Sequence, residues 1–177
     1  MKKRILTWLL AISMLGSLLT VPAGAAAVTK FSDVSDSYTA TAVETLRLMG
    51  VLDGYGDGTF RPDTILNRAQ FCKMAVYAMD GSEELGRYST VTIFPDVKPS
   101  HGASAYINMA AKKGIISGFA DGKFKPGQTV TAGQAVTILM RGLGYKDEDM
   151  GGVWPQSYMA EAQTNGLLKS TGITSAY

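Results

Sequence analysis

The sequence predicts a mainly α-helical protein built from tandem helix-turn-helix repeats, and two observations carry this prediction. The first is an internal duplication, because residues 54–62 (GYGDGTFRP) are repeated at 118–126 (GFADGKFKP). Self-similarity at a fixed offset is the signature of repeat architectures. The second is the recurrence of apolar residues at three- and four-residue steps on both sides of this turn, which is typical of helices with one buried face.

The duplication extends beyond the turn in both directions. Upstream, residues 31–34 (FSDV) correspond to 94–97 (FPDV), and downstream, residues 67–70 (NRAQ) correspond to 131–134 (TAGQ). The matches keep one order and nearly one spacing throughout. Chance would not preserve both, so each copy is expected to form the same structural unit.

Helices are expected over residues 38–49 and 68–79 of the first copy and at the equivalent places in the second. The pairs Asn67/Gln70 and Thr131/Gln134 resemble capping boxes, which begin the second helix at the same point in both copies. Glycines and a proline between the helices specify a tight, non-helical connection. The expected core includes the following residues: Val43, Leu46, Phe71, Met74, Ala110, Ile115, Ile138 and Leu139.

A third copy begins at residue 152 and does not reach its turn. Trp154, Tyr158, Ala162 and the segment 165–168 follow the spacing of the second copy, after which the glycine-rich turn does not recur. A partial repeat is therefore expected, from a fragment or a truncated product. The predicted organisation is a leader at 1–25, a first repeat at 29–82, a linker at 83–93, a second repeat at 94–146 and a partial third repeat at 152–177.

The N-terminus has the three zones of a secretory signal peptide in order. Lys2, Lys3 and Arg4 precede an apolar stretch over 5–19, and small residues follow up to the expected cleavage after Ala25. The apolar stretch is short for a bilayer-spanning helix, so no membrane association is expected after cleavage. Cleavage removes three basic residues and no acidic one, which takes the formal net charge from +2 to −1. A nucleic-acid partner, which needs clustered positive charge, is therefore not expected.

Enzymatic function has little support in the sequence. The chain has one histidine, His101, and one cysteine, Cys72, and it lacks both a nucleophile elbow and a phosphate-binding loop. A pair of acids for glycoside hydrolysis stays open at this point, although most acids lie in the repeated turns. With a single cysteine, no disulfide framework is expected. We predict a non-catalytic protein without a cofactor.

The combined pattern resembles the S-layer homology (SLH) repeat of bacterial envelope proteins. The resemblance covers residues 31–80, 94–144 and 152–168. It implies a fold in which three repeats usually close into a pseudo-threefold helical prong, whose grooves hold a secondary cell-wall polysaccharide, often one carrying a pyruvate ketal. It thus implies a secreted protein, anchored non-covalently to the cell wall or S-layer, with self-association or S-layer proteins as further partners.

Arg68 is the main candidate for glycan binding, because it falls where the family has its key basic residue. A guanidinium in the first turn of a helix, beside free backbone amides, also forms a site for a carboxylate. The alternative is an ion pair of Arg68 with Asp63 or Asp57. The second copy has Ala132 at this position, which puts its groove in doubt.

Six other residues complete the predicted glycan-binding set. Aromatic side chains at the starts of two first helices either stack on a sugar or pack in the core, and the remaining residues lie in or beside the turns. The six are Tyr38, Gly54, Asp57, Arg61, Lys125 and Trp154.

Two other functions stay open. A structural repeat that drives self-assembly without binding a glycan would have the same fold. A calcium loop beginning at Asp53 would need an acid at its twelfth position, where the chain has Thr64. We therefore expect no metal site.

Overall fold

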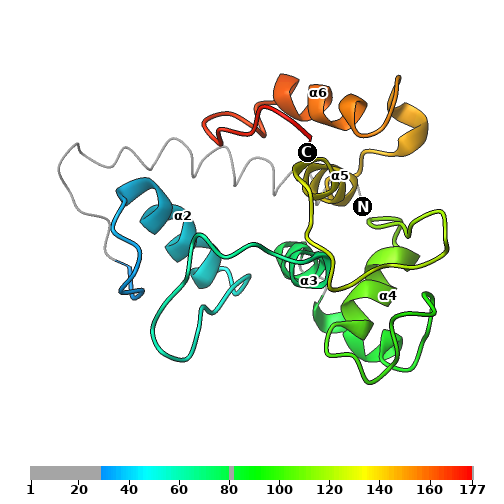
Figure 1. The fold of residues 1–177 in the computed structure, drawn as a ribbon, viewed down its shortest axis with the longest axis horizontal. Helices are drawn as coiled ribbons and strands as arrows, with labels where there is room; N and C mark the ends of the chain where they lie inside the picture. Colours follow the sequence, from blue (N-terminus) through cyan, green and yellow to red (C-terminus); the bar gives the residue numbers. More distant parts are fainter. Residues whose placement is uncertain (1–28, 80–81, 177) are drawn as a thin grey trace. The chain divides into compact units, whose positions relative to one another are not determined.

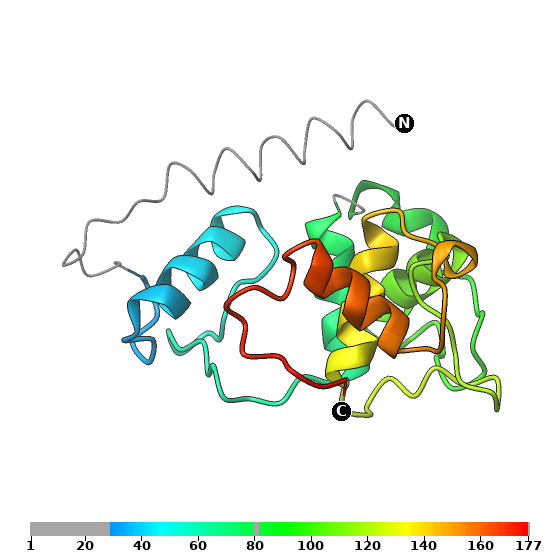
Figure 2. The same ribbon diagram turned by 90° about the horizontal axis from the view of Figure 1, so that it is seen from above.

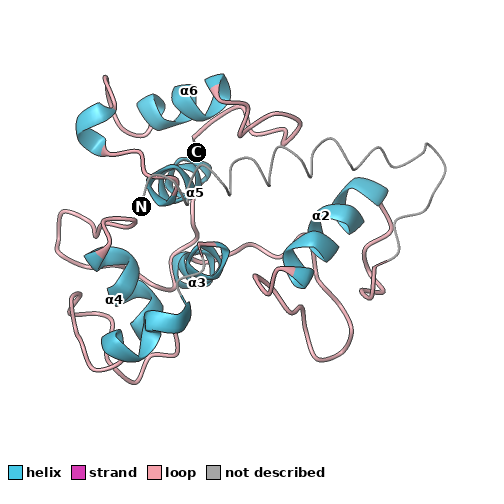
Figure 3. Cartoon of the chain, turned by 180° about the vertical axis from the view of Figure 1, so that it is seen from behind, coloured by secondary structure: helices cyan, strands magenta, loops and turns pink. Residues whose placement is uncertain are grey.

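The structure of the chain is a computed structural model that describes residues 29–79 and 82–176. The predicted leader at 1–25 lies outside these residues. The described part of the chain consists of helices and loops (Figure 3), with an isolated β-bridge between Asn67 and Thr129. In order, the helices are α2 (Ser37–Leu48), α3 (Arg68–Ala78), the 3-10 helix η1 (Ser82–Tyr88), α4 (Ser104–Lys112), α5 (Ala132–Gly142), the 3-10 helix η2 (Asp147–Asp149) and α6 (Gln156–Thr164). The prediction of a mainly helical fold with helix-turn-helix repeats is confirmed.

Two compact units divide the chain differently from the sequence repeats. The first unit contains the described residues up to Thr45 together with Gly54–Arg61. The second contains Leu46–Asp53 and the described residues from Pro62 onward. The second helix of the first repeat, α3, thus belongs to the same unit as the second repeat. Among the described residues, no helix has the length and apolar character needed to cross a membrane.

Helices α3 and α5 form the centre of the second unit. They are seen end-on and next to each other in Figure 1 and from the side in Figure 2. Helix α4 packs against α3, and α6 packs against α5. The apolar contacts form two clusters, one around α3 and α4 and one between α5 and α6. Within this unit, the first helix of a repeat therefore packs against the second helix of the preceding repeat.

Within each repeat, an aspartate closes the loop between the first motif and the turn. The Asp33 carboxylate accepts hydrogen bonds from the amides of Phe60 and Arg61 at 2.8 and 2.7 Å. Arg61 has a positive φ of 61°, which a side-chain-bearing residue rarely adopts. The hydrogen bond from the Phe60 amide, and after it that from Arg61, lowers the pKa of Asp33. The carboxylate thus holds a turn that the backbone alone disfavours.

The second repeat has the same closure. Asp96 accepts from the amides of Phe124 and Lys125 at 2.9 and 2.7 Å, and Lys125 has a φ of 57°. The ring of Phe94 lies 5.5 Å from that of Phe124, and a Cβ atom added to Gly118 would lie 2.7 Å from Phe94. The close approach of this ring explains why the turn needs a glycine there.

The linker between the repeats is held against α4 by a buried asparagine. Asn108 is fully buried, and its Nδ2 donates to the carbonyl of Val91 at 2.6 Å. Its Oδ1 accepts from the amide of Ile93 at 3.3 Å. One side chain therefore pairs two backbone groups of the linker with α4.

Only one of the two predicted capping boxes is complete in the structure. At the start of α3 the box is complete, because the side chains of Asn67 and Gln70 each accept from the other's backbone amide at 2.9 Å. At the start of α5, Thr131 Oγ1 accepts from the Gln134 amide at 3.3 Å. The Gln134 side chain, however, bonds elsewhere, so the prediction of a full box there is wrong.

The predicted core is correct in part. Val43, Ala110, Ile115 and Ile138 are buried, whereas the other four are only half-buried: Leu46, Phe71, Met74 and Leu139. Residues of the repeated motifs outside the helices are buried in the core instead, because the loops that carry them fold back over the helix ends. The buried aromatic and valine residues of these motifs are Phe31, Val34, Phe94, Val97 and Phe124.

Candidate functional site

The Arg68 side chain forms hydrogen bonds with the turn of the following repeat and not with the turn of its own repeat. Its side chain leaves the first turn of α3 and reaches residues 117–124 of the second repeat. Its Nε donates to the Phe124 carbonyl at 2.8 Å, Nη1 to Gln134 Oε1 at 2.9 Å and Nη2 to the Ser117 carbonyl at 3.3 Å. Only 4% of Arg68 is exposed. The suggested ion pair with Asp63 or Asp57 is wrong, because all three guanidinium nitrogens bond these neutral acceptors and Asp57 pairs with Arg61 at 2.7 Å.

The backbone amides at the start of α3 are not free. The Arg68 amide donates to the Gln128 carbonyl at 2.8 Å and the Ala69 amide to the Pro126 carbonyl at 3.0 Å. The next two amides are bonded to Asn67, one through its side chain and one through its carbonyl. The expectation that free amides assist Arg68 is therefore wrong, because the neighbouring repeat and the cap take them up.

Two aromatic rings support the Arg68 guanidinium. Its central carbon lies 4.6 Å from the centroid of Phe119 and 4.5 Å from that of Phe124. Such cation–π contacts stabilise a desolvated positive charge. Burial lowers the pKa of Arg68, but an arginine stays protonated at neutral pH even so. The group is thus a fixed, partly desolvated cation.

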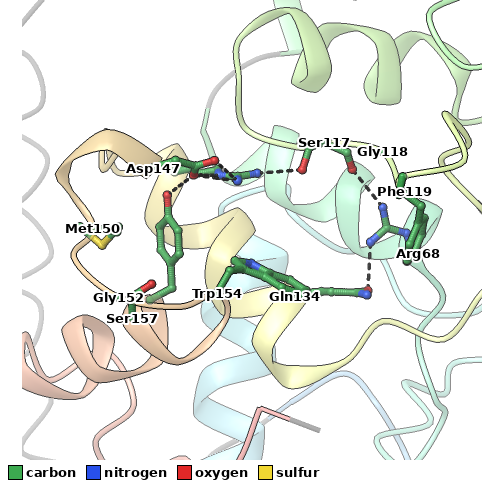
Figure 4. Close-up of a pocket in the computed structure, with 13 residues that line it drawn as sticks. Arg68, Ser117, Gly118, Phe119, Gln134, Asp147, Met150, Gly152, Trp154 and Ser157 are labelled. Atoms are coloured by element: carbon green, nitrogen blue, oxygen red, sulfur yellow. Dashed lines mark hydrogen bonds and ion pairs between the residues drawn. The ribbon is translucent and has the colours of Figure 1, made fainter.

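A cavity of about 450 Å³ opens beside this guanidinium. Figure 4 shows Arg68, the 117–119 segment, Trp154 and Asp147 around it. The walls come from α3, the second-repeat turn, α5, the η2 segment and the entry to α6. The lining residues are Arg68, Ser117, Gly118, Phe119, Ala120, Gln134, Arg141, Asp147, Met150, Gly152, Trp154, Ser157 and Tyr158.

Trp154 forms an aromatic wall of this cavity. Its indole Nε1 donates to Thr137 Oγ1 at 3.0 Å, which fixes the ring against α5. Even so, 51% of Trp154 is exposed, as is 63% of Tyr38 in the other unit. The alternative of core packing is therefore wrong for both side chains.

Ser117 also bonds a second arginine, Arg141. Arg141, near the end of α5, donates from Nε and Nη2 to the Asp147 carboxylate at 2.9 and 2.7 Å, and from Nη1 to Ser117 Oγ at 3.3 Å. The Tyr158 hydroxyl donates to Asp147 Oδ1 at 2.6 Å. Tyr158 and Arg141 together lower the pKa of Asp147, so this carboxylate is ionised at neutral pH.

The structure brings together only some of the predicted glycan-binding residues. Arg68 and Trp154 line the same cavity. Lys125 lies beside it, with Nζ 4.3 Å from the Phe119 centroid and 3.1 Å from Asp121. The other four belong to the first unit: Tyr38, Gly54, Asp57 and Arg61.

The three first-unit residues of the turn have contacts within their own repeat. Thr59 donates to Asp57 from both its amide and its hydroxyl, and the Arg61 guanidinium pairs with Asp57 and lies 3.9 Å from the centroid of Tyr55. A Cβ atom added to Gly54 would overlap the Phe31 ring. These contacts explain the similarity of the two turn sequences by structure alone, so no ligand is needed to account for it.

Sequence reasoning missed several cavity residues, above all Arg141, Asp147, Gln134 and Tyr158. Arg141 and Asp147 have no equivalent in the repeat pattern that drew attention to Arg68. One available signal was the position of Arg141 in the last turn of an amphipathic helix, shortly before an acidic segment. The sequence indicates only a capping role for Gln134.

Comparisons with known proteins agree with this architecture. The profile of the S-layer homology domain matches residues 30–72 and 93–136. Over 157 residues the chain is 38% identical to a cell surface protein of Thermoanaerobacter kivui, covering 87% of this chain and 20% of that protein. It is 32% identical over 146 residues to the middle cell wall protein of Brevibacillus brevis, covering 81% and 14%. It is 32% identical over 120 residues to a cellulosome-anchoring protein of Acetivibrio thermocellus, covering 64% and 26%.

The family match and these relatives place the helical repeats among the modules that attach proteins to the bacterial cell wall. The chain belongs to the S-layer homology family. Its location at the cell surface and cell wall is thereby confirmed. The chain spans between about one seventh and one quarter of the length of the three relatives described.

Proposed function

We propose that the Arg68 cavity binds an acidic secondary cell-wall polysaccharide and so anchors the protein non-covalently to the wall. The observation that carries this proposal is the chemistry of the Arg68 acceptors. All three are neutral, two being backbone carbonyls and one an amide oxygen. They orient the guanidinium without neutralising its charge. A buried cation whose hydrogen bonds leave its charge uncompensated favours an anion in the adjoining cavity.

Trp154 supports a sugar rather than a small inorganic anion. Its ring is half-exposed in the cavity wall and is held in place by the hydrogen bond to Thr137. A fixed aromatic face can cover the apolar C–H face of a pyranose and exclude water from it. The combination of this face with Arg68 fits a sugar that carries a carboxylate, such as a pyruvate ketal.

Binding to purified cell-wall sacculi tests the proposal. Wild type should sediment with sacculi and fail to do so after the non-peptidoglycan polymer has been stripped. Arg68→Ala should bind about ten- to a hundredfold more weakly, the usual effect of losing a hydrogen bond to a charged group. Trp154→Ala should also bind more weakly. The control is Arg87→Ala, which removes an exposed arginine of η1 in the same unit.

Circular dichroism must show that each variant is folded. A folded Arg68→Ala variant that binds as tightly as wild type would refute the assignment and direct attention to Lys125 and the turn residues. Wild-type binding that survives polymer stripping would also count against it. If wild type fails to bind sacculi but forms oligomers, the self-assembly function replaces this one.

A further inference from the structure

The Arg141–Asp147 pair has an uneven exposure that a simple structural ion pair does not require. The Arg141 side chain is only 11% exposed, whereas the Asp147 side chain is 69% exposed. Both line the same cavity as Arg68. The buried member of the pair is therefore the cation, and the member that covers it is largely in solvent.

The position of Arg141 relative to Arg68 is set by one residue. The Ser117 carbonyl accepts from Arg68, and the Ser117 hydroxyl accepts from Arg141. The two guanidinium groups therefore bond the same serine, and both border the cavity. The two differ in one respect, because Arg68 bonds only neutral acceptors while Arg141 is bonded by a carboxylate at two nitrogens.

We propose that Arg141 is a second anion-binding residue of the cavity and that Asp147 is its exchangeable counter-ion, displaced by a carboxylate of the acidic glycan. This inference rests on the proposed function. The exchange replaces one carboxylate by another, so Arg141 never loses its ion-pair partner. The Tyr158 hydroxyl, which donates to Asp147, can donate to the incoming carboxylate in the same way.

The cost of moving Asp147 away is small. Its side chain is already mostly hydrated, and it belongs to η2, a helix of three residues whose members are all exposed. The bonds that it gives up to Arg141 and Tyr158 are replaced by those of the incoming carboxylate. Asp147 thus shields Arg141 from unspecific anions and competes weakly with a ligand that offers a well-placed carboxylate.

Asp147→Asn tests the exchange, with Glu148→Gln as a matched control. The neighbouring Glu148 carries the same charge, is exposed and pairs with Lys146 instead of a cavity residue. Calorimetric titration uses polysaccharide released from purified sacculi. Asp147→Asn should bind about two- to fivefold more tightly than wild type, the size of one exposed ion pair. Glu148→Gln should gain clearly less, and Arg141→Ala in the Asp147→Asn background should lose the gain.

An Asp147→Asn affinity no higher than that of Glu148→Gln would overturn the inference, and so would a gain that persists without Arg141. A second measurement on the wild-type chain does not depend on the polysaccharide or on how the variants fold. Sodium pyruvate should shift the Arg141 Nε–H resonance in nuclear magnetic resonance spectra, and an unchanged resonance at saturating pyruvate would overturn the exchange. Loss of polysaccharide binding in wild type, with this shift retained, would refute the proposed function alone.

Discussion

Arg68 and Gln134 join the first turns of two helices that are 66 residues apart in sequence, through a hydrogen bond of 2.9 Å between Nη1 and Oε1. This bond explains why the two repeats cap their second helices differently. Gln70 closes its own capping box, whereas Gln134 gives its side-chain oxygen to the arginine of the preceding repeat. Gln70 and Gln134 thus accept different hydrogen bonds, because only Gln134 has an arginine from the preceding repeat within reach.

Replacing Arg68 by lysine should destabilise the second unit. A lysine keeps the charge but lacks the planar fork, so it leaves acceptors at Phe124, Gln134 or Ser117 unpaired. The free energy of unfolding should fall by about 1–3 kcal/mol, the usual effect of leaving a buried acceptor unsatisfied. Urea denaturation measures this change, with Arg87→Lys as the control for a lost arginine at the surface. Equal midpoints for both variants would show that the Arg68 fork is not needed for folding.

Gly118→Ala should destabilise the second repeat through overpacking. The added Cβ atom would lie 2.7 Å from Phe94 and 2.9 Å from the Lys123 carbonyl oxygen, so the ring or the turn has to shift. We expect a loss of about 1–3 kcal/mol. Gly127→Ala is the matched control, because a Cβ atom there meets nothing within 4 Å. Thermal melting compares the two, and a Gly118→Ala protein as stable as Gly127→Ala would contradict the close packing.

Acid should weaken the loop closures at Asp33 and Asp96. Burial of Asp96 opposes its ionisation, but the amides of Phe124 and Lys125 outweigh this effect and lower its pKa. A folded-state pKa below the unfolded value gives stability that is present above about pH 4 and is lost as the pH falls through the folded pKa. Thr59 and Arg61 lower the pKa of Asp57 to about 2. The pH range over which acid reduces the stability therefore extends down to about pH 2.

Asp96→Asn should therefore lower the melting temperature near neutral pH, and its difference from wild type should narrow below about pH 4. Melting curves between pH 2 and pH 7 measure this effect. Asp53→Asn, at an exposed position of the same unit, is the control. A difference between wild type and Asp96→Asn that stays constant across this range would rule out the carboxylate as its source.

Cys72 should react with thiol reagents only when the second unit opens. The side chain is fully buried in the cluster around α3, and burial raises the pKa of its thiol to about 12. The thiolate, which is the reactive form, is therefore scarce at pH 8. Modification by a chromogenic disulfide should be slow in buffer and fast in urea. Fast labelling of the native protein would show that the cluster is open on that time scale.

The sequence was sufficient to predict the helices and their starting points, because periodicity and caps are local signals. Asn67 and Gln70 show this, since three residues separate the two halves of the cap. The partners of Arg68 could not be predicted in the same way. Its acceptors lie 49, 56 and 66 residues away, on the second-repeat turn and at the start of α5, and their approach depends on how the repeats pack.

The hydrophobic pattern of the sequence also could not predict how far each apolar side chain is buried. Val43 and Leu46 share one helix face by spacing, yet Val43 is buried and Leu46 is only half-buried. Which part of a face is covered depends on the loops that return over it. In this chain these loops carry Phe31 and Phe94, which contribute to the core from outside any helix.

The loop closures by aspartate and the Arg68 contacts differ in the length of chain that they span, and this difference affects the order of folding. Asp33 and Asp96 each close a loop spanning 27 to 29 residues, whereas Arg68 reaches acceptors 49 to 66 residues away. Short loops cost less entropy to close, so the repeats are expected to form before they dock through Arg68. Arg68→Lys should consequently accelerate unfolding while changing the refolding rate little, whereas Asp96→Asn should slow refolding in stopped-flow experiments.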